Sequence, residues 1–171
     1  MNEFDGSAVV VTQSERDTRW FFRNLVDVIA TGEQTGGAYA MFELIGPPGD
    51  EVPMHVHTEE DEAFLLIEGE MTVWVGGDVR VLHAGDYALM PRHVVHCYKV
   101  TGDIPARWLG ITSPAGFEKY VVEISDPAAE RRMPDFTGFD AAKMEALGRI
   151  SEKYGVTFRG GPGQRPSDLR N

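Results

Sequence analysis

Short apolar segments alternate with turn signals over more than half of this 171-residue chain, from about Phe21 to about Thr112. The turn signals are TGG at 35–37, GPPGD at 46–50, EGE at 68–70, GGD at 76–78, HAGD at 83–86 and TGD at 101–103. The segments between them are AYAMFELI, EAFLLI, MTVWV, VRVL, YALM, VVHCYKV and ARWLGIT. Each is rich in aromatic and β-branched residues and too short for a typical helix, and the turns recur close to the roughly 8–12-residue spacing of all-β sandwiches and barrels. This rhythm predicts an all-β domain.

The pattern changes to a helical one after Ser113. Ser113 is placed to cap a helix, Pro114 suits its first position, and apolar residues then recur at i, i+3, i+4 and i+7. Asp140 is placed to cap a second helix. We therefore expect residues 1–113 to form a β-barrel with N-terminal strands. Residues 114–171 are expected to form a helical extension with a loose tail, packed on the same domain.

The charge balance and the cysteine content restrict the partners and the compartment. A formal net charge of -11 leaves no basic surplus to neutralise phosphates, so we expect neither nucleic acid nor an anionic membrane as a partner. Cys97 is the one cysteine, which fits a reducing compartment. The N-terminus lacks the features of a signal peptide, and no apolar run approaches the roughly 20 residues of a spanning helix. We expect a cytoplasmic protein with a small-molecule substrate.

Three histidines and one glutamate have the spacing of a metal site. His55 and His57 are two positions apart, and on a strand such residues point to the same face. Glu62 begins the next apolar strand, where an inward carboxylate is costly to bury unless it faces a cation. His96 lies in the middle of a later strand. Three imidazoles and one carboxylate suit a first-row divalent metal and leave coordination positions open, as a catalytic site requires.

The alternative interpretations of these residues are simpler. The paired histidines could lie on the surface of a polar loop, and the third could be a core histidine bonded to backbone. Glu59, Glu60 and Asp61, which precede the candidate glutamate, are interpreted as solvated loop residues whose charge draws cations toward the site.

Strand alternation also suggests which residues line a substrate pocket. If Glu62 points inward, so does Phe64, and if His96 points inward, so does Tyr98. Phe64 and Tyr98 are therefore candidates for contact with an aromatic substrate, with core packing alone as the alternative.

The opposite face of the same strand is unusually apolar for a solvated surface, since it carries Ala63, Leu65 and Ile67. Burial against a second sheet or a second subunit would explain this composition. We expect a homodimer.

The two histidine-bearing stretches together resemble the motifs of the cupin superfamily. Residues 49–69 have the glycine, the paired histidines, the glutamate and the closing glycine of the first cupin motif without a gap. Residues 85–96 resemble the second motif, although His93 stands where the family usually has glycine and Val100 where it often has asparagine. The resemblance covers roughly residues 41–113. The SPAGFEKY segment that follows is similar to single-domain cupins of the quercetin 2,3-dioxygenase type.

The resemblance implies an all-β fold with appended helices, a double-stranded β-helix or jelly-roll barrel. It implies that His55, His57, Glu62 and His96 bind one divalent transition metal per chain. Fe(II) is favoured, and nickel, manganese, cobalt, copper and zinc are the alternatives. The implied activity is a metal-dependent dioxygenase that uses O2 on a small oxygenated, aromatic or enolisable substrate, with Glu62 as the catalytic proton acceptor. The alternatives are an isomerase, cyclase or decarboxylase in a biosynthetic pathway, or a non-enzymatic cupin that binds a small molecule.

Overall fold

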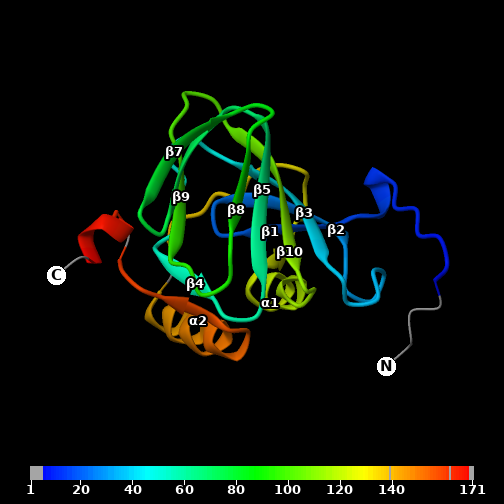
Figure 1. Ribbon diagram of the computed structural model, residues 1–171. Coiled ribbons are helices and arrows are strands. Elements are labelled where there is room, and N and C mark those ends of the chain that lie inside the picture. The colour runs from blue at the N-terminus through cyan, green and yellow to red at the C-terminus, as the bar shows by residue number, and fades with distance from the viewer. Residues whose placement is uncertain (1–5, 139, 162, 170–171) are drawn as a thin grey trace.

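The strands of this protein form two antiparallel sheets that face one another (Figure 1). The computed structural model describes residues 6–138, 140–161 and 163–169. The larger sheet contains, in spatial order, β11 (Asp126–Pro127), β1 (Asp17–Phe21), β2 (Asn24–Ala30), β3 (Ala40–Gly46), β10 (Ala106–Ser113), β5 (Asp61–Glu68) and β8 (Tyr87–Met90). The smaller sheet contains β12 (Val156–Phe158), β4 (His55–His57), β9 (His96–Val100), β6 (Glu70–Val75) and β7 (Asp78–His83).

The helices gather at one end of these sheets. Helices α1 (Phe117–Ile124) and α2 (Ala141–Lys153) lie at the lower end of the molecule in Figure 1, near β4 and β10. Two short 3-10 helices span Gln13–Glu15 and Pro166–Leu169. Within the described ranges, no helix combines the length and the apolar character needed to traverse a bilayer.

The expected all-β fold with appended helices is confirmed, and the arrangement of the two sheets is that of a jelly roll. All seven strands expected between the turn signals are present, as β3 and β5 to β10. The expected barrel is not closed by hydrogen bonds, because no pairing of the described strands joins the two sheets. The interior is therefore enclosed between two facing sheets.

Apolar side chains from the inner faces of both sheets form the main core. Along β10, every second residue is buried from Ala106 to Thr112, as alternation requires. Trp108 is fully buried among them and packs against Phe64 and Tyr98. Burial of each large apolar side chain contributes roughly 1.5–3 kcal/mol, so this core holds the sheets together.

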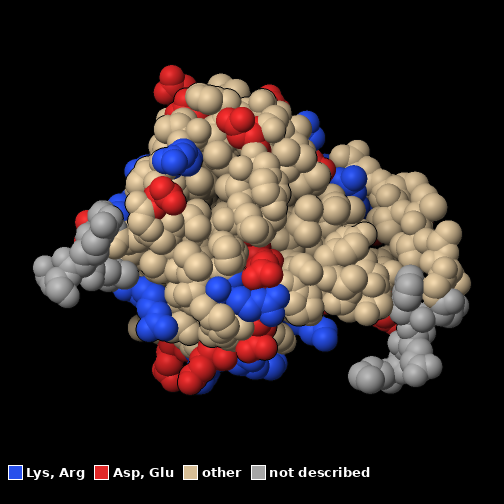
Figure 2. All heavy atoms as spheres, in the orientation of Figure 1, with Lys and Arg blue, Asp and Glu red and all other residues tan. Residues whose placement is uncertain are grey.

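The outer face of the larger sheet remains apolar at its β8 edge. Leu65, Tyr87 and Leu89 are 37%, 60% and 50% exposed, and their registers place them side by side on β5 and β8. Figure 2, drawn from the same side, shows few charged side chains over these two strands. Of the three residues expected on this face, Leu65 is exposed and Ile67 is partly exposed, whereas Ala63 is buried.

Two turns need an unusual backbone. Gly69, between β5 and β6, has a φ of 85°, and a Cβ there would lie 2.8 Å from the Cα of Ala106. His93 has a φ of 66°, in the left-handed region that glycine adopts most readily. Its N–H donates to the carbonyl of His57 at 2.8 Å, so this turn is tied to β4.

The two helices begin differently from one another. The prediction that Ser113 caps the first helix, with Pro114 at its first position, is wrong, because β10 continues through Ser113 and α1 starts only at Phe117. The second helix begins as expected, since Asp140 Oδ1 accepts a hydrogen bond from the Lys143 N–H at 2.8 Å.

Asp27 on β2 is a buried carboxylate that connects distant parts of the chain. Arg131, from the link after β11, donates to Asp27 Oδ1 at 2.7 Å, and Thr18 donates to the same oxygen at 2.7 Å. Arg16 lies 3.4 Å from the other oxygen. Burial disfavours ionisation of Asp27, but these hydrogen bonds outweigh it and hold its pKa below the ordinary 3.8.

We expect Asp27→Asn to lower the free energy of unfolding by about 1.5–3 kcal/mol near neutral pH, the usual range for hydrogen bonds to a charged group. Because the folded pKa is depressed, this contribution is fully present above pH 3.8 and is lost as the pH falls through the lowered value. Urea unfolding at a series of pH values should therefore show the wild-type and variant curves converging in acid. Curves that remain parallel would contradict the assignment.

Candidate metal centre

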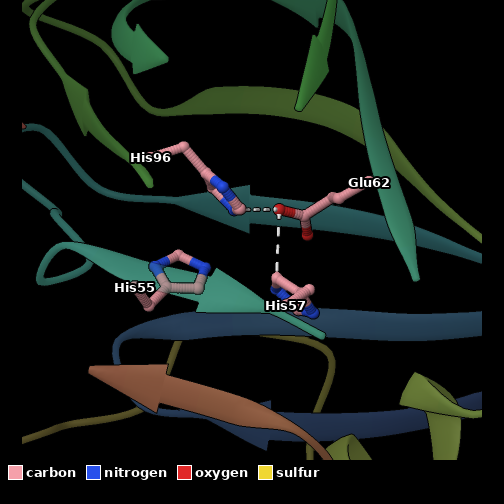
Figure 3. A group of neighbouring side chains, drawn as sticks. All are labelled: His55, His57, Glu62 and His96. Carbon is pink, nitrogen blue, oxygen red and sulfur yellow. Dashed lines mark ion pairs between the residues drawn. The ribbon is translucent and has the colours of Figure 1, made fainter. Parts of the chain in front are cut away.

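Three imidazoles and one carboxylate converge between the two sheets. His55 and His57 come from β4, His96 from β9 and Glu62 from β5 (Figure 3). All four residues are buried, and one potential ligand atom from each lies within 4.8 Å of the others. The structure therefore brings together the whole set that the sequence singled out, and the group has the composition of a metal site.

Strand pairing explains how the histidines meet. β4 is hydrogen-bonded between β12 and β9, and the pairing of β4 with β9 places His55 opposite His96. Their ring centroids are 4.3 Å apart, and the His57 ring lies 5.5 Å from that of His96. Glu62 reaches the three rings from the opposite sheet. The centre thus spans the space between the sheets and depends on both.

Backbone carbonyls orient two of the three imidazoles. His55 Nδ1 lies 2.9 Å from the carbonyl oxygen of Pro53, and His96 Nδ1 lies 2.9 Å from that of Val94. A neutral imidazole that donates from Nδ1 has its lone pair on Nε2, which is the form that binds a metal. These hydrogen bonds therefore prepare both rings as Nε2 ligands.

The charges in the centre favour an ionised carboxylate beside a neutral His55. Glu62 Oε2 lies 3.2 Å from His96 Nε2 and 3.9 Å from His57 Nε2. Burial alone would raise the pKa of Glu62, but contact with His96 and the charges of the other histidines bring it to about 2. For His55, burial and the neighbouring histidines lower the pKa to about 3. Glu62 is therefore ionised at neutral pH, and His55 is neutral.

A cation fits this arrangement. The buried Nε2 atoms of His57 and His96 have no hydrogen-bond partner among the described residues, although both are near Glu62. Unpartnered buried nitrogens are costly, and a metal ion would satisfy them together with the carboxylate. Three nitrogens and one oxygen suit a first-row divalent metal and leave positions open for other ligands.

Comparison with known proteins agrees with this geometry. A family model for the cupin domain matches residues 42–112, which contain all four side chains of the centre. The chain belongs to the cupin family. Quercetin 2,3-dioxygenase of Bacillus subtilis (strain 168) is 30% identical over 124 residues, which are 72% of this chain and 36% of that protein. Quercetin 2,3-dioxygenase of Aspergillus japonicus is 30% identical over 95 residues, 52% of this chain and 27% of that protein.

This cupin therefore spans about a third of the length of the curated relatives it matches. Among solved structures, KdgF from Halomonas sp. superposes with a TM-score of 0.59 at 17% identity, covering 66% of this chain and 99% of that one. At this identity the likeness concerns the fold.

The two predicted pocket residues lie deeper between the sheets of the cupin domain. The rings of Phe64 and Tyr98 are 5.7 Å apart, and each is near Trp108 in the main core. The Tyr98 hydroxyl donates to Asp50 Oδ2 at 3.1 Å, and burial raises the pKa of Tyr98 well above its ordinary value. Both residues have core packing partners, and their contact with a substrate stays a prediction.

The prediction of solvated loop residues before Glu62 is wrong for Glu60, which is buried, whereas Asp61 is solvated as expected but belongs to β5 and not to a loop. Glu60 is only 3% exposed and lies 3.5 Å from His57 Nδ1. Asp61 belongs to β5, where Arg92 holds it through its backbone N–H, Nε and Nη2. Glu59 is exposed, as expected. Glu60 lies in the link between β4 and β5, where no strand alternation marked it as buried.

The C-terminal extension supports the centre in a way that the sequence did not indicate. β12 pairs with β4, so that Val156 lies opposite His57 and Phe158 opposite His55. From α1, the Phe117 ring packs 4.9 Å from the His57 ring. The division of the chain near residue 113 stays a prediction, but residues on both sides of it contact the histidines.

Proposed function

We propose that this cupin is a metal-dependent dioxygenase that acts on a small oxygenated substrate, aromatic or enolisable. The observation that carries the proposal is the buried set of three imidazoles and one ionised carboxylate with its ligand atoms within 4.8 Å. The 30% identity to a quercetin 2,3-dioxygenase over 72% of the chain supports the choice of reaction.

In this proposal His55, His57, Glu62 and His96 hold one divalent metal ion, with Fe(II) favoured over nickel, manganese, cobalt, copper and zinc. When bound, such an ion supplies Lewis acidity and open positions for a deprotonated hydroxyl group and for O2. The hydrogen bonds to Pro53 and Val94 already orient two of the rings, so little rearrangement is needed to bind it.

Glu62 is the proposed proton acceptor for the substrate hydroxyl group. It is ionised across the neutral range, and its position at the centre lets it accept a proton from a substrate bound there. Burial of the four residues limits access of bulk water to the reacting atoms.

Phe64 and Tyr98 are the proposed apolar contacts of the substrate. Because the Tyr98 hydroxyl donates to Asp50 and lies 3.3 Å from Asn24 Nδ2, it is already engaged. Only the ring of Tyr98 is therefore left for a substrate, and we propose that this part of the site recognises an aromatic surface through packing.

Oxygen consumption tests the proposed reaction. Protein loaded with Fe(II) is mixed with quercetin, other flavonols and simple β-diketones in an oxygen electrode, and Glu62→Gln is the matched control. We expect the control to lose about 10²–10⁴-fold in rate, the typical contribution of a positioned general base. Turnover without oxygen uptake would overturn the dioxygenase in favour of an isomerase, cyclase or decarboxylase. Binding without turnover would favour a binding protein.

We also propose that two copies of the chain pair through the apolar face of β5 and β8. A contiguous surface of large exposed apolar side chains is unusual on a monomer. Leu65, Tyr87 and Leu89 form such a surface next to an edge strand, and a second copy offers an equally apolar face.

Sedimentation at micromolar concentration tests the pairing. We expect a dimer for the wild type and a monomer for Leu89→Glu, because the charge would be buried against the partner copy. Val81→Glu is the matched control, since Val81 is 49% exposed but lies on β7 of the other sheet. A wild type that sediments as a monomer would refute the proposal.

A further inference from the structure

Glu60 is a buried carboxylate without a hydrogen-bonded partner for one of its oxygens. Its neighbour Glu59 is exposed, whereas Glu60 is 3% exposed and its Oε2 atom has no hydrogen-bond partner among the described residues. Removing a carboxylate from water in this way costs several kcal/mol unless another group compensates. The burial of Glu60 therefore requires a compensating partner for its carboxylate.

An imidazole of the metal centre lies close to this oxygen. Glu60 Oε2 lies 3.5 Å from His57 Nδ1, slightly beyond the roughly 2.7–3.2 Å of a formed hydrogen bond. Nδ1 of His57 also has no hydrogen-bond partner among the described residues. A small movement of either side chain would join two buried groups that otherwise both remain unsatisfied.

His57 differs in this respect from the other two histidines. His55 and His96 each have a backbone carbonyl 2.9 Å from Nδ1, and the corresponding position at His57 faces Glu60. The surroundings hold this pair in place. Phe117 packs against the His57 ring, and a Cβ on Gly116 would lie 3.3 Å from Glu60 Oε1, so α1 begins directly against the carboxylate.

We propose that Glu60 is a positioning residue that accepts a hydrogen bond from His57 Nδ1 and so fixes His57 as an Nε2 ligand. The inference rests on the proposed metal centre. A carboxylate acceptor makes an imidazole a stronger electron donor than a carbonyl acceptor does. The three histidines are then unequal, and His57 is the strongest donor of the set.

The positioning role of Glu60 is tested by two separate measurements, the metal affinity of the protein and the tautomer of His57. Co(II) is titrated in competition with a chelating dye into the wild type, Glu60→Leu, Glu60→Gln and Glu59→Gln. We expect Glu60→Leu to bind about 10–100-fold more weakly, the usual cost of losing an outer partner of a metal ligand. Glu60→Gln should recover part of the loss, because its amide oxygen still accepts from Nδ1–H. Glu59→Gln, with the same change at the exposed neighbour, should match the wild type.

The imidazole ¹⁵N signals of the metal-free protein give the second measurement. We expect a single Nδ1–H tautomer for His57 in the wild type and in Glu60→Gln, and a mixture in Glu60→Leu, with His55 and His96 unchanged. Wild-type protein that does not bind Co(II) would refute the metal centre, while the tautomers would still report on Glu60. Wild-type affinity and an unchanged His57 tautomer in Glu60→Leu would overturn the role of Glu60 alone.

Discussion

His96→Ala should retain little metal after purification, whereas the wild type should carry about one equivalent of a transition metal per chain. The substitution removes one imidazole and also the group 3.2 Å from Glu62, so it weakens two of the four proposed ligands. The loss of affinity should exceed the roughly 10–100-fold that follows loss of an outer partner. Elemental analysis of tag-free protein, purified without chelators, makes the measurement.

His83→Ala is the matched control for this experiment. The His83 side chain is 67% exposed and lies near Glu70, away from the centre. Its replacement should leave the metal content unchanged. If wild type and His96→Ala are equally empty, the proposed dioxygenase loses its foundation and a metal-free binding protein becomes the better interpretation.

Val156→Asp should destabilise the protein strongly and also abolish most metal binding. Val156 is 4% exposed on β12, directly opposite His57 on β4. A buried, uncompensated charge costs about 3–5 kcal/mol, and the same charge would separate β12 from the strand that carries two of the ligands. Urea unfolding gives the change in stability, and Co(II) titration below the unfolding transition gives the change in affinity.

Thr157→Asp is the matched control for Val156→Asp, because it places the same charge on the opposite face of β12. Thr157 is adjacent to Val156, points to the other side of β12 and is partly exposed, so the same substitution there should cost much less. Equal losses of stability and Co(II) affinity in the two variants would show that the buried contact of Val156 is not what supports the centre. A stable Val156→Asp protein with full Co(II) affinity would show that β4 holds its ligands in position without the buried Val156 of β12.

The strands between the turn signals were predictable because each combines alternation with a clear turn at its ends. The four residues of the centre were predictable for a related reason, since two short motifs fix both their spacing and their parity. β12 was not predictable, because a three-residue strand has almost no periodicity and exists only through its pairing with β4. Its contribution to the centre is a tertiary effect that sequence patterns do not contain.

The local sequence pattern is misleading at two residues, Ser113 and Glu60. Ser113 and Pro114 have the features of a helix start, yet the ladder with β5 extends through Ser113 and takes precedence over local propensity. Glu60 lies in a run of four acids, which is typical of a solvated loop, yet the short link between β4 and β5 places it beside His57. In both cases the tertiary structure, and not the local sequence pattern, decided the outcome.

The pairing of β4 with β12 also has a consequence for biosynthesis. The ligands on β4 and β5 are made early, but the strand that borders β4 comes from residues after 155. A nascent chain that does not yet extend past residue 158 therefore lacks the finished centre, even when its first three ligands have emerged. We expect the ion to be acquired only after β12 has been made, in competition with whatever cations the cell then supplies.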